Sequence, residues 1–150
     1  MARSNVPLTA GGKMVAVAGA LFLLDTFAPW HRLCVGVLDV EACRTDDAWA
    51  TSFSSLAAML VLALVAEVLA VQVAGVRPPE LGQVEWGQFR LAVSALATGL
   101  VLMQLMAGDG ALDRSFGIFA GLLLSAGLTY GNYLRAADLP IAAQPGGAYR

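Results

Sequence analysis

Four apolar segments, each nearly free of charged residues, follow one another between Lys13 and Arg135 of this 150-residue chain. Segments of roughly 17–26 residues can cross about 30 Å of hydrocarbon as α-helices, which rise about 1.5 Å per residue. The chain is 58% hydrophobic and 13% charged, so a soluble domain of this length could not bury its apolar surface. The pattern therefore predicts an all-α membrane protein, a bundle of four transmembrane helices surrounded by the lipid bilayer.

Glycine and proline residues between the apolar segments indicate where the helices end. The predicted transmembrane domain covers residues 13–135, with helices at about 13–29, 50–75, 87–107 and 115–135. Residues 1–12 and 136–150 are predicted to be flexible tails. The first segment is expected to be retained as a helix, because it ends in Pro29-Trp30-His31-Arg32 and not in a cleavage site of small residues.

The basic residues indicate the orientation, because four crossings leave both termini on one side of the membrane. Six of the nine cations fall on the side of the termini, which predicts cytoplasmic termini for a multi-pass protein of the plasma membrane. Those six are Arg3, Lys13, Arg77, Arg90, Arg135 and Arg150, and the other three are Arg32, Arg44 and Arg114. The net charge of −2, without a basic patch that alternates with aromatic residues, excludes a nucleic-acid partner.

The two cysteines, Cys34 and Cys43, both fall in the first outer loop, at about 30–49. An external compartment permits disulfides, so a structural bridge is predicted, with two free thiols as the alternative. Closing so short a loop gains roughly 2–3 kcal/mol. A catalytic pair would resemble the quinone-linked thiol oxidases, which are also four-helix membrane bundles. Those enzymes use a Cys-x-x-Cys pair, which this chain lacks.

Glu67 lies inside the second apolar segment, near its cytoplasmic end. An ionised carboxylate in hydrocarbon is costly, so Glu67 is expected to face the bundle and find a partner. Arg90 can extend toward that depth, and Tyr130 could also donate a hydrogen bond. A polar clamp between the second and third helices is favoured over a proton or cation site.

Asp25 is predicted to lie near the outer interface, with Gln104 at a similar height. His31, Arg32 or Arg114 could approach it, and a clamp is again favoured over a site. Because Asp25 and Glu67 lie at opposite depths, no paired-carboxylate centre is predicted. Trp30 is expected to be an interfacial anchor, with His31 hydrated beside it. A single histidine without a cysteine cluster is a poor metal site, so neither a metal nor another cofactor is predicted.

Small residues recur at helical spacing in three of the segments. They let helix backbones approach closely inside a membrane. These faces pack either within one chain or between copies in a homo-oligomer, and the sequence leaves both open. The residues are Gly117, Gly121, Ser125, Gly127 and Gly131 in the fourth segment, Ala95 and Gly99 in the third, and Ala16 and Ala20 in the first.

Three local patterns together resemble an uncharacterised group of small four-helix membrane proteins from GC-rich Gram-positive bacteria. They are Gly11-Gly12-Lys13 with Phe27-Ala28-Pro29-Trp30, then Asp47-Ala48-Trp49-Ala50, and finally Arg114-Ser115-Phe116-Gly117-Ile118 with Tyr133-Leu134-Arg135. The resemblance implies a plasma-membrane location and no known activity.

The chain is more loosely similar to claudin-type tetraspan proteins. The similarity consists of four helices, a short cytoplasmic N-terminus and Trp30 followed by two cysteines in the first outer loop. That loop is expected to be too short for the claudin extracellular sheet, and the Gly-Leu-Trp motif is missing. The resemblance therefore concerns architecture only.

No phosphate loop, nucleotide-binding turn, nucleophile elbow or zinc motif occurs in the sequence. The leading hypothesis is a non-enzymatic membrane protein that acts through assembly, as a homo-oligomer or as an accessory subunit of a membrane complex. The first alternative is an oligomeric ion channel with Glu67 or Asp25 in the pathway. The second is a membrane thiol oxidoreductase that uses Cys34 and Cys43.

Overall fold

A computed structural model of the chain describes residues 9–37, 40–76, 85–107 and 113–142. Four α-helices dominate this part of the chain, in agreement with the four apolar segments. They are α1 (Ala10–Asp25), α2 (Ser52–Val68), α3 (Trp86–Met106) and α4 (Phe116–Ala142). The third helix begins and ends one residue from its predicted bounds, and the other three differ more.

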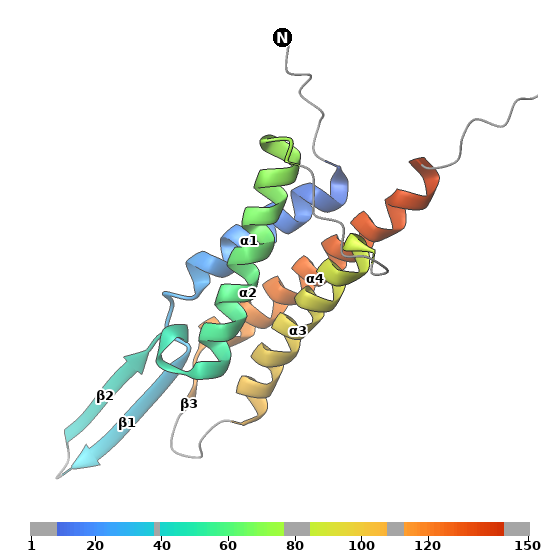
Figure 1. Ribbon diagram of the computed structural model, residues 1–150. Helices are drawn as coiled ribbons and strands as arrows, with labels where there is room; N and C mark the ends of the chain where they lie inside the picture. The colour runs from blue at the N-terminus through green and yellow to red at the C-terminus, as the bar shows by residue number, and fades with distance from the viewer. Residues whose placement is uncertain (1–8, 38–39, 77–84, 108–112, 143–150) are drawn as a thin grey trace, which may run out of the picture.

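The helices run alternately in opposite directions and form a closed ring, in which α1 packs on α2 and α4, and α3 also packs on α2 and α4 (Figure 1). The start of α1 and the end of α4 lie at one end of the bundle, here called the termini end (Figure 1). A small β-sheet lies at the opposite end, here called the sheet end (Figure 1). Each buried side chain can therefore be assigned to one of two ends.

Helix α1 begins earlier than predicted, and Gly11 and Gly12 lie inside its first turn. The side chain of Thr9 caps the helix by accepting a hydrogen bond of 3.1 Å from the amide of Gly12. A Cβ atom on Gly11 would lie 2.7 Å from the carbonyl oxygen of Gly131, and one on Gly12 would overlap Gln72. The prediction of a flexible tail over 1–12 is therefore wrong for 10–12, where glycine permits close helix packing; residues 1–8 lie outside the described part.

Two other helices also differ from their predicted ends. The last turn of the second apolar segment is a π-helix, η2 (Leu69–Val73), which ends before Gly75 at a φ of 70°. Helix α4 continues to Ala142, beyond the expected end at 135. The tail predicted over 136–150 is therefore helical over its first seven residues, and residues 143–150 lie outside the described part.

The prediction of a purely α-helical protein missed a three-stranded antiparallel sheet with the order β2-β1-β3. Strand β1 (His31–Val37) pairs with β2 (Val40–Asp46), and β3 (Asp113–Arg114) pairs with the start of β1. A short 3-10 helix, η1 (Ala48–Ala50), then leads into α2. The first outer loop, which the all-α prediction left without secondary structure, therefore forms a hairpin whose two strands pair along their whole described length.

Trp30 is the largest fully buried side chain among the described residues, so its expected role as an interfacial anchor is wrong. Its ring packs edge-on against Phe22, with ring centroids 6.1 Å apart, and its indole nitrogen donates to the backbone carbonyl of Asp25 at 2.9 Å. Its own backbone joins the sheet to α4, because the amide binds Asp46 O and the carbonyl accepts from Ser115 N. Trp30 therefore fastens the sheet to the bundle.

The small residues predicted on α4 pack within the chain. Cβ atoms on Gly117 and Gly121 would collide with the Trp30 ring, and one on Gly131 would lie 3.0 Å from Val15. Ser125 is fully buried, and a Cβ on Gly127 would meet Ala18 at 3.8 Å. Gly99 on α3 differs from these positions, because a Cβ placed there would meet no atom within 4 Å.

Large apolar side chains cover the outside of the helices. Two helical stretches are long and apolar enough to cross a membrane, Ser52–Val73 with 22 residues and Trp86–Met106 with 21. Helix α1 has 16 residues and would rise only about 24 Å along its axis. Exposed examples are Leu24, Phe27, Leu56, Met59, Leu96, Met103, Met106, Phe116 and Leu123.

Candidate functional site

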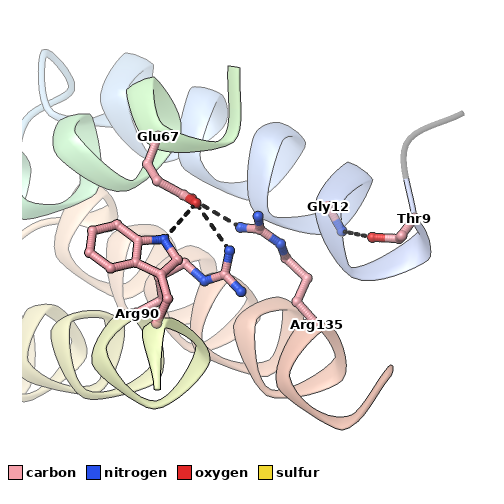
Figure 2. A network of polar contacts seen from close by, with 6 residues as sticks. Thr9, Gly12, Glu67, Arg90 and Arg135 are labelled. Atoms are coloured by element: carbon pink, nitrogen blue, oxygen red, sulfur yellow. Dashed lines mark hydrogen bonds and ion pairs between the residues drawn. The ribbon is translucent and has the colours of Figure 1, made fainter. Parts of the chain in front are cut away.

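Glu67 lies at the centre of a polar cluster at the termini end of the bundle (Figure 2). One carboxylate oxygen, Oε1, accepts hydrogen bonds from the indole of Trp86 at 3.1 Å and from Nη1 of Arg90 at 3.0 Å. The other oxygen, Oε2, accepts from Nη1 of Arg135 at 3.2 Å. These four residues, Glu67, Trp86, Arg90 and Arg135, are called the Glu67 cluster below.

Three helices supply the cluster, and each supplies it near an end. Glu67 comes from the last turn of α2, Trp86 and Arg90 from the first turns of α3, and Arg135 from the C-terminal part of α4. Only 12% of the Glu67 side chain is exposed, with 9% for Arg90 and 4% for Arg135. The cluster is therefore a largely buried ionic contact that ties α2 to both α3 and α4.

The contacts of Glu67 differ in part from those expected. The structure brings Arg90 to Glu67, as the depth of the two residues suggests. It places Tyr130 on the outer face of α4, where 54% of the residue is exposed and its ring stacks on Tyr133. Trp86 and Arg135 take the donor role instead, so the Tyr130 expectation is wrong.

The sequence does not predict Arg135 at this site. It is the last residue of a predicted helix, where a charged side chain is expected to lie at the membrane interface. The structure buries it, since Gly11 and Gly131 let α1 and α4 approach closely around its side chain. The sequence contains a signal for this contact in two glycines. Gly131 lies four residues before Arg135, and Gly11 lies two residues before Lys13.

Several buried polar atoms at the termini end have no hydrogen-bond partner among the described residues. They include Nε of Arg90, both polar atoms of the Asn132 amide and Oε1 of Gln72. Asn132 lies three residues before Arg135, and Gln72 lies in η2, against Gly12. The termini end therefore has unused hydrogen-bonding donors and acceptors at the same end as the ion pairs.

Polar side chains continue from the cluster toward the middle of the bundle, along the contact between α3 and α4. The hydroxyl groups of Thr98 and Thr129 lie 2.9 Å apart, across the two helices. Ser94 and Ser125 are fully buried and bond to carbonyls of their own helices. Beyond them the core is apolar, with Val101 and Phe22 fully buried, so no continuous polar path follows from the described contacts.

The polar residues at the sheet end form separate contacts. Nε2 of Gln104 lies 3.1 Å from Nε2 of His31, and His31 is only 7% exposed. His31 is thus buried, not hydrated as expected, because β1 carries it under α3. Oδ2 of Asp25 is buried and has no hydrogen-bond partner in the described residues, and neither Arg32 nor Arg114 forms an ion pair with it there.

Cys34 and Cys43 face each other across β1 and β2, with sulfur atoms 2.10 Å apart, the distance of a disulfide bond. Both residues are exposed, and together they account for all cysteines of the chain. The bridge closes the hairpin at its fourth residue pair from the Trp30 side. It therefore stabilises the part of the sheet that projects from the bundle.

Replacing both Cys34 and Cys43 with serine is expected to lower the stability of the hairpin by roughly 2–3 kcal/mol, because the loop is no longer closed in the unfolded chain. Amide hydrogen exchange should accelerate in β1 and β2. Exchange in α2 and α3 should stay unchanged, since their contacts do not involve the bridge. Equal acceleration in all four segments would contradict this local role.

The chemistry of the described side chains points to charge pairing and hydrogen bonding. No group of three or more His, Cys, Asp or Glu residues within the described ranges could hold a metal ion. Asp25 and Glu67 lie at opposite ends of the bundle, as expected. Comparison with known proteins gave no match: no family model, no curated protein and no solved structure matches this chain.

Proposed function

We propose that this chain is an integral membrane protein of four transmembrane helices that acts by assembling with other copies or subunits in the bilayer, and not by catalysis. The two long apolar helices and the exposed apolar side chains support the membrane placement. Under this proposal α1 and α4 also cross, the termini face the cytoplasm, and the sheet end faces outward. The excess of cations on the side of the termini supports that orientation.

The single observation that carries the assembly proposal is the open space at Gly99. Most glycines of the other helices are filled by side chains or backbone of this same chain, whereas Gly99 meets nothing. Ala92 and Ala95 lie on the same exposed face of α3, so a second helix could approach this backbone closely. Leu96 and Met103, 55% and 53% exposed, flank that face and offer adaptable apolar contact.

Gly99→Leu is expected to weaken the assembly without unfolding the chain. The added side chain blocks the approach of a partner helix, and its Cβ atom has open space around it, with no atom of the bundle within 4 Å. We expect at least about a tenfold loss in the association constant, equivalent to roughly 1.4 kcal/mol. The measurement is the mass distribution in lipid nanodiscs or mild detergent, by native mass spectrometry.

Ala63→Leu is the matched control, because it adds a similar side chain to an exposed position of α2. It should leave the mass distribution unchanged. A wild-type particle that is strictly monomeric and purifies with nothing else would contradict the proposal. So would a Gly99→Leu protein with the wild-type mass distribution.

The two other functional hypotheses receive less support from the described contacts. Glu67 is engaged by two guanidinium groups and an indole, so it is not free to coordinate a passing cation. The cysteines form one bridge on a projecting hairpin, away from any second thiol in this sequence. Neither a pore nor a thiol oxidoreductase is therefore proposed.

A further inference from the structure

The described residues of the Glu67 cluster carry an excess of positive charge. Arg90 and Arg135 supply two guanidinium groups, and Glu67 supplies one carboxylate. The exposed Glu85 precedes α3 but forms no ion pair with either arginine. Both guanidinium groups are largely buried, so bulk water cannot solvate the extra positive charge of the cluster. One singly charged anion would neutralise that charge.

Unused hydrogen-bonding groups lie at the same end of the bundle. Nε of Arg90 and Nδ2 of Asn132 are buried donors that meet no described acceptor, and Asn132 is only 1% exposed. Buried polar groups are nearly always paired with protein, water or ligand, since leaving them unpaired costs free energy. A ligand with several acceptor oxygens would satisfy these donors and the charge together.

Aromatic side chains lie near the cluster, as expected for the depth of lipid headgroups under the membrane placement proposed above. Trp86 donates to Glu67 and stacks on Phe89, and Tyr130 stacks on Tyr133 further along α4. Tryptophan and tyrosine favour the membrane–water interface, where phosphate groups of lipids also lie. Buried basic residues between transmembrane helices on the cytoplasmic side are a known means of holding lipid headgroups.

We propose that the termini end of the bundle binds one phosphate group, as a singly charged oxyanion, through Arg90 and Arg135, with the Asn132 amide as a further donor. The planar guanidinium group matches phosphate oxygens with paired hydrogen bonds. A phospholipid headgroup and free inorganic phosphate share this chemistry. Binding of a lipid headgroup rests on the membrane placement proposed above, whereas binding of free inorganic phosphate does not.

The test uses the full chain in mild detergent with three additions: phosphatidylglycerol, zwitterionic phosphatidylcholine and sodium phosphate. Native mass spectrometry counts bound lipid, and a thermal unfolding scan measures the midpoint. Saturating phosphatidylglycerol should give a one-lipid adduct and raise the midpoint by roughly 5 °C, while phosphatidylcholine gives neither. A rise with sodium phosphate alone identifies the free ion as the ligand.

Variants separate this site from general surface charge. Arg90→Gln and Arg135→Gln should each lower the fraction of protein with one bound lipid at least tenfold. Lys13→Gln removes an exposed cation of the same end and should leave that fraction unchanged. Because the arginine variants also break ion pairs, Glu67→Gln provides the second check. It raises the local positive charge, so it should bind the phosphate at least as well although its bundle is less stable.

Three results would overturn the inference. The first is that neither phosphatidylglycerol nor sodium phosphate binds or raises the midpoint. The second is that Lys13→Gln and Arg135→Gln lose lipid binding equally. The third is that Glu67→Gln loses lipid binding although its helices are intact. The oligomer mass is read in the same spectra. A failure of phosphate binding is therefore distinguishable from a failure of the assembly proposal.

Discussion

Glu67→Leu is expected to lower the free energy of unfolding by about 3–5 kcal/mol. The change leaves Arg90 and Arg135 buried without their carboxylate, and it removes the acceptor for the Trp86 indole. An unpaired buried charge costs more than the ion pair itself gains. Unfolding by SDS in mixed micelles, followed by the helical circular dichroism signal, measures the loss.

Two further variants separate this explanation from a general loss of negative charge. Glu85→Gln removes an exposed carboxylate close to the cluster and should change the free energy of unfolding by less than about 0.5 kcal/mol. The triple variant Glu67→Leu, Arg90→Leu, Arg135→Leu should recover most of the loss, because no charge then stays buried alone. If Glu67→Leu unfolds at the wild-type SDS fraction, the cluster does not hold the helices together.

Trp30→Ala is expected to cost about 3–5 kcal/mol, which is typical for truncation of a fully buried tryptophan. The substitution opens a cavity beside Phe22 and Gly121 and removes the hydrogen bond to the carbonyl of Asp25. It also loosens the start of β1, which keeps its backbone hydrogen bond to the residue before α4. The same SDS titration measures the change, and hydrogen exchange in β1 reports the loosened sheet.

Trp49→Ala is the matched control, since Trp49 follows the same sheet but is 40% exposed. Its truncation should cost about 1 kcal/mol or less. The opposite order, with Trp49→Ala the more destabilising, would indicate that Trp30 is an interfacial anchor after all. Such a result would contradict the packing of the sheet end.

The sequence predicted the number of helices well, because a long continuous apolar segment can form few structures other than a helix. It placed α3 within one residue, since charged and glycine residues bound that run closely. It failed at the start of α1, where Gly11 and Gly12 were assigned to a flexible tail, and at the end of α4, which continues beyond residue 135. Glycine at a close helix contact, such as Gly11 against Gly131, depends on a distant partner that no local pattern reveals.

The candidate site was predictable to a similar extent. The depth of Glu67 in an apolar run indicates a buried partner, and Arg90 is the cation whose depth matches. The fourth member, Arg135, required knowledge of how α4 packs, and Trp86 required knowledge of how the first turn of α3 lies against the end of α2. Trp30 and His31 were placed at the interface because they follow an apolar run, yet strand pairing with Asp46 and Arg114 carries them inward.

Cysteine labelling in intact cells tests the membrane placement most directly. In a Cys34→Ser, Cys43→Ser background, Thr45→Cys reports the sheet end, while Thr9→Cys and Ala137→Cys report the termini end; all three positions are exposed. A membrane-impermeant maleimide should label Thr45→Cys in intact cells and the other two only after permeabilisation. Labelling of one terminus but not the other from outside, or a purified chain that stays dispersed without detergent, would contradict four crossings.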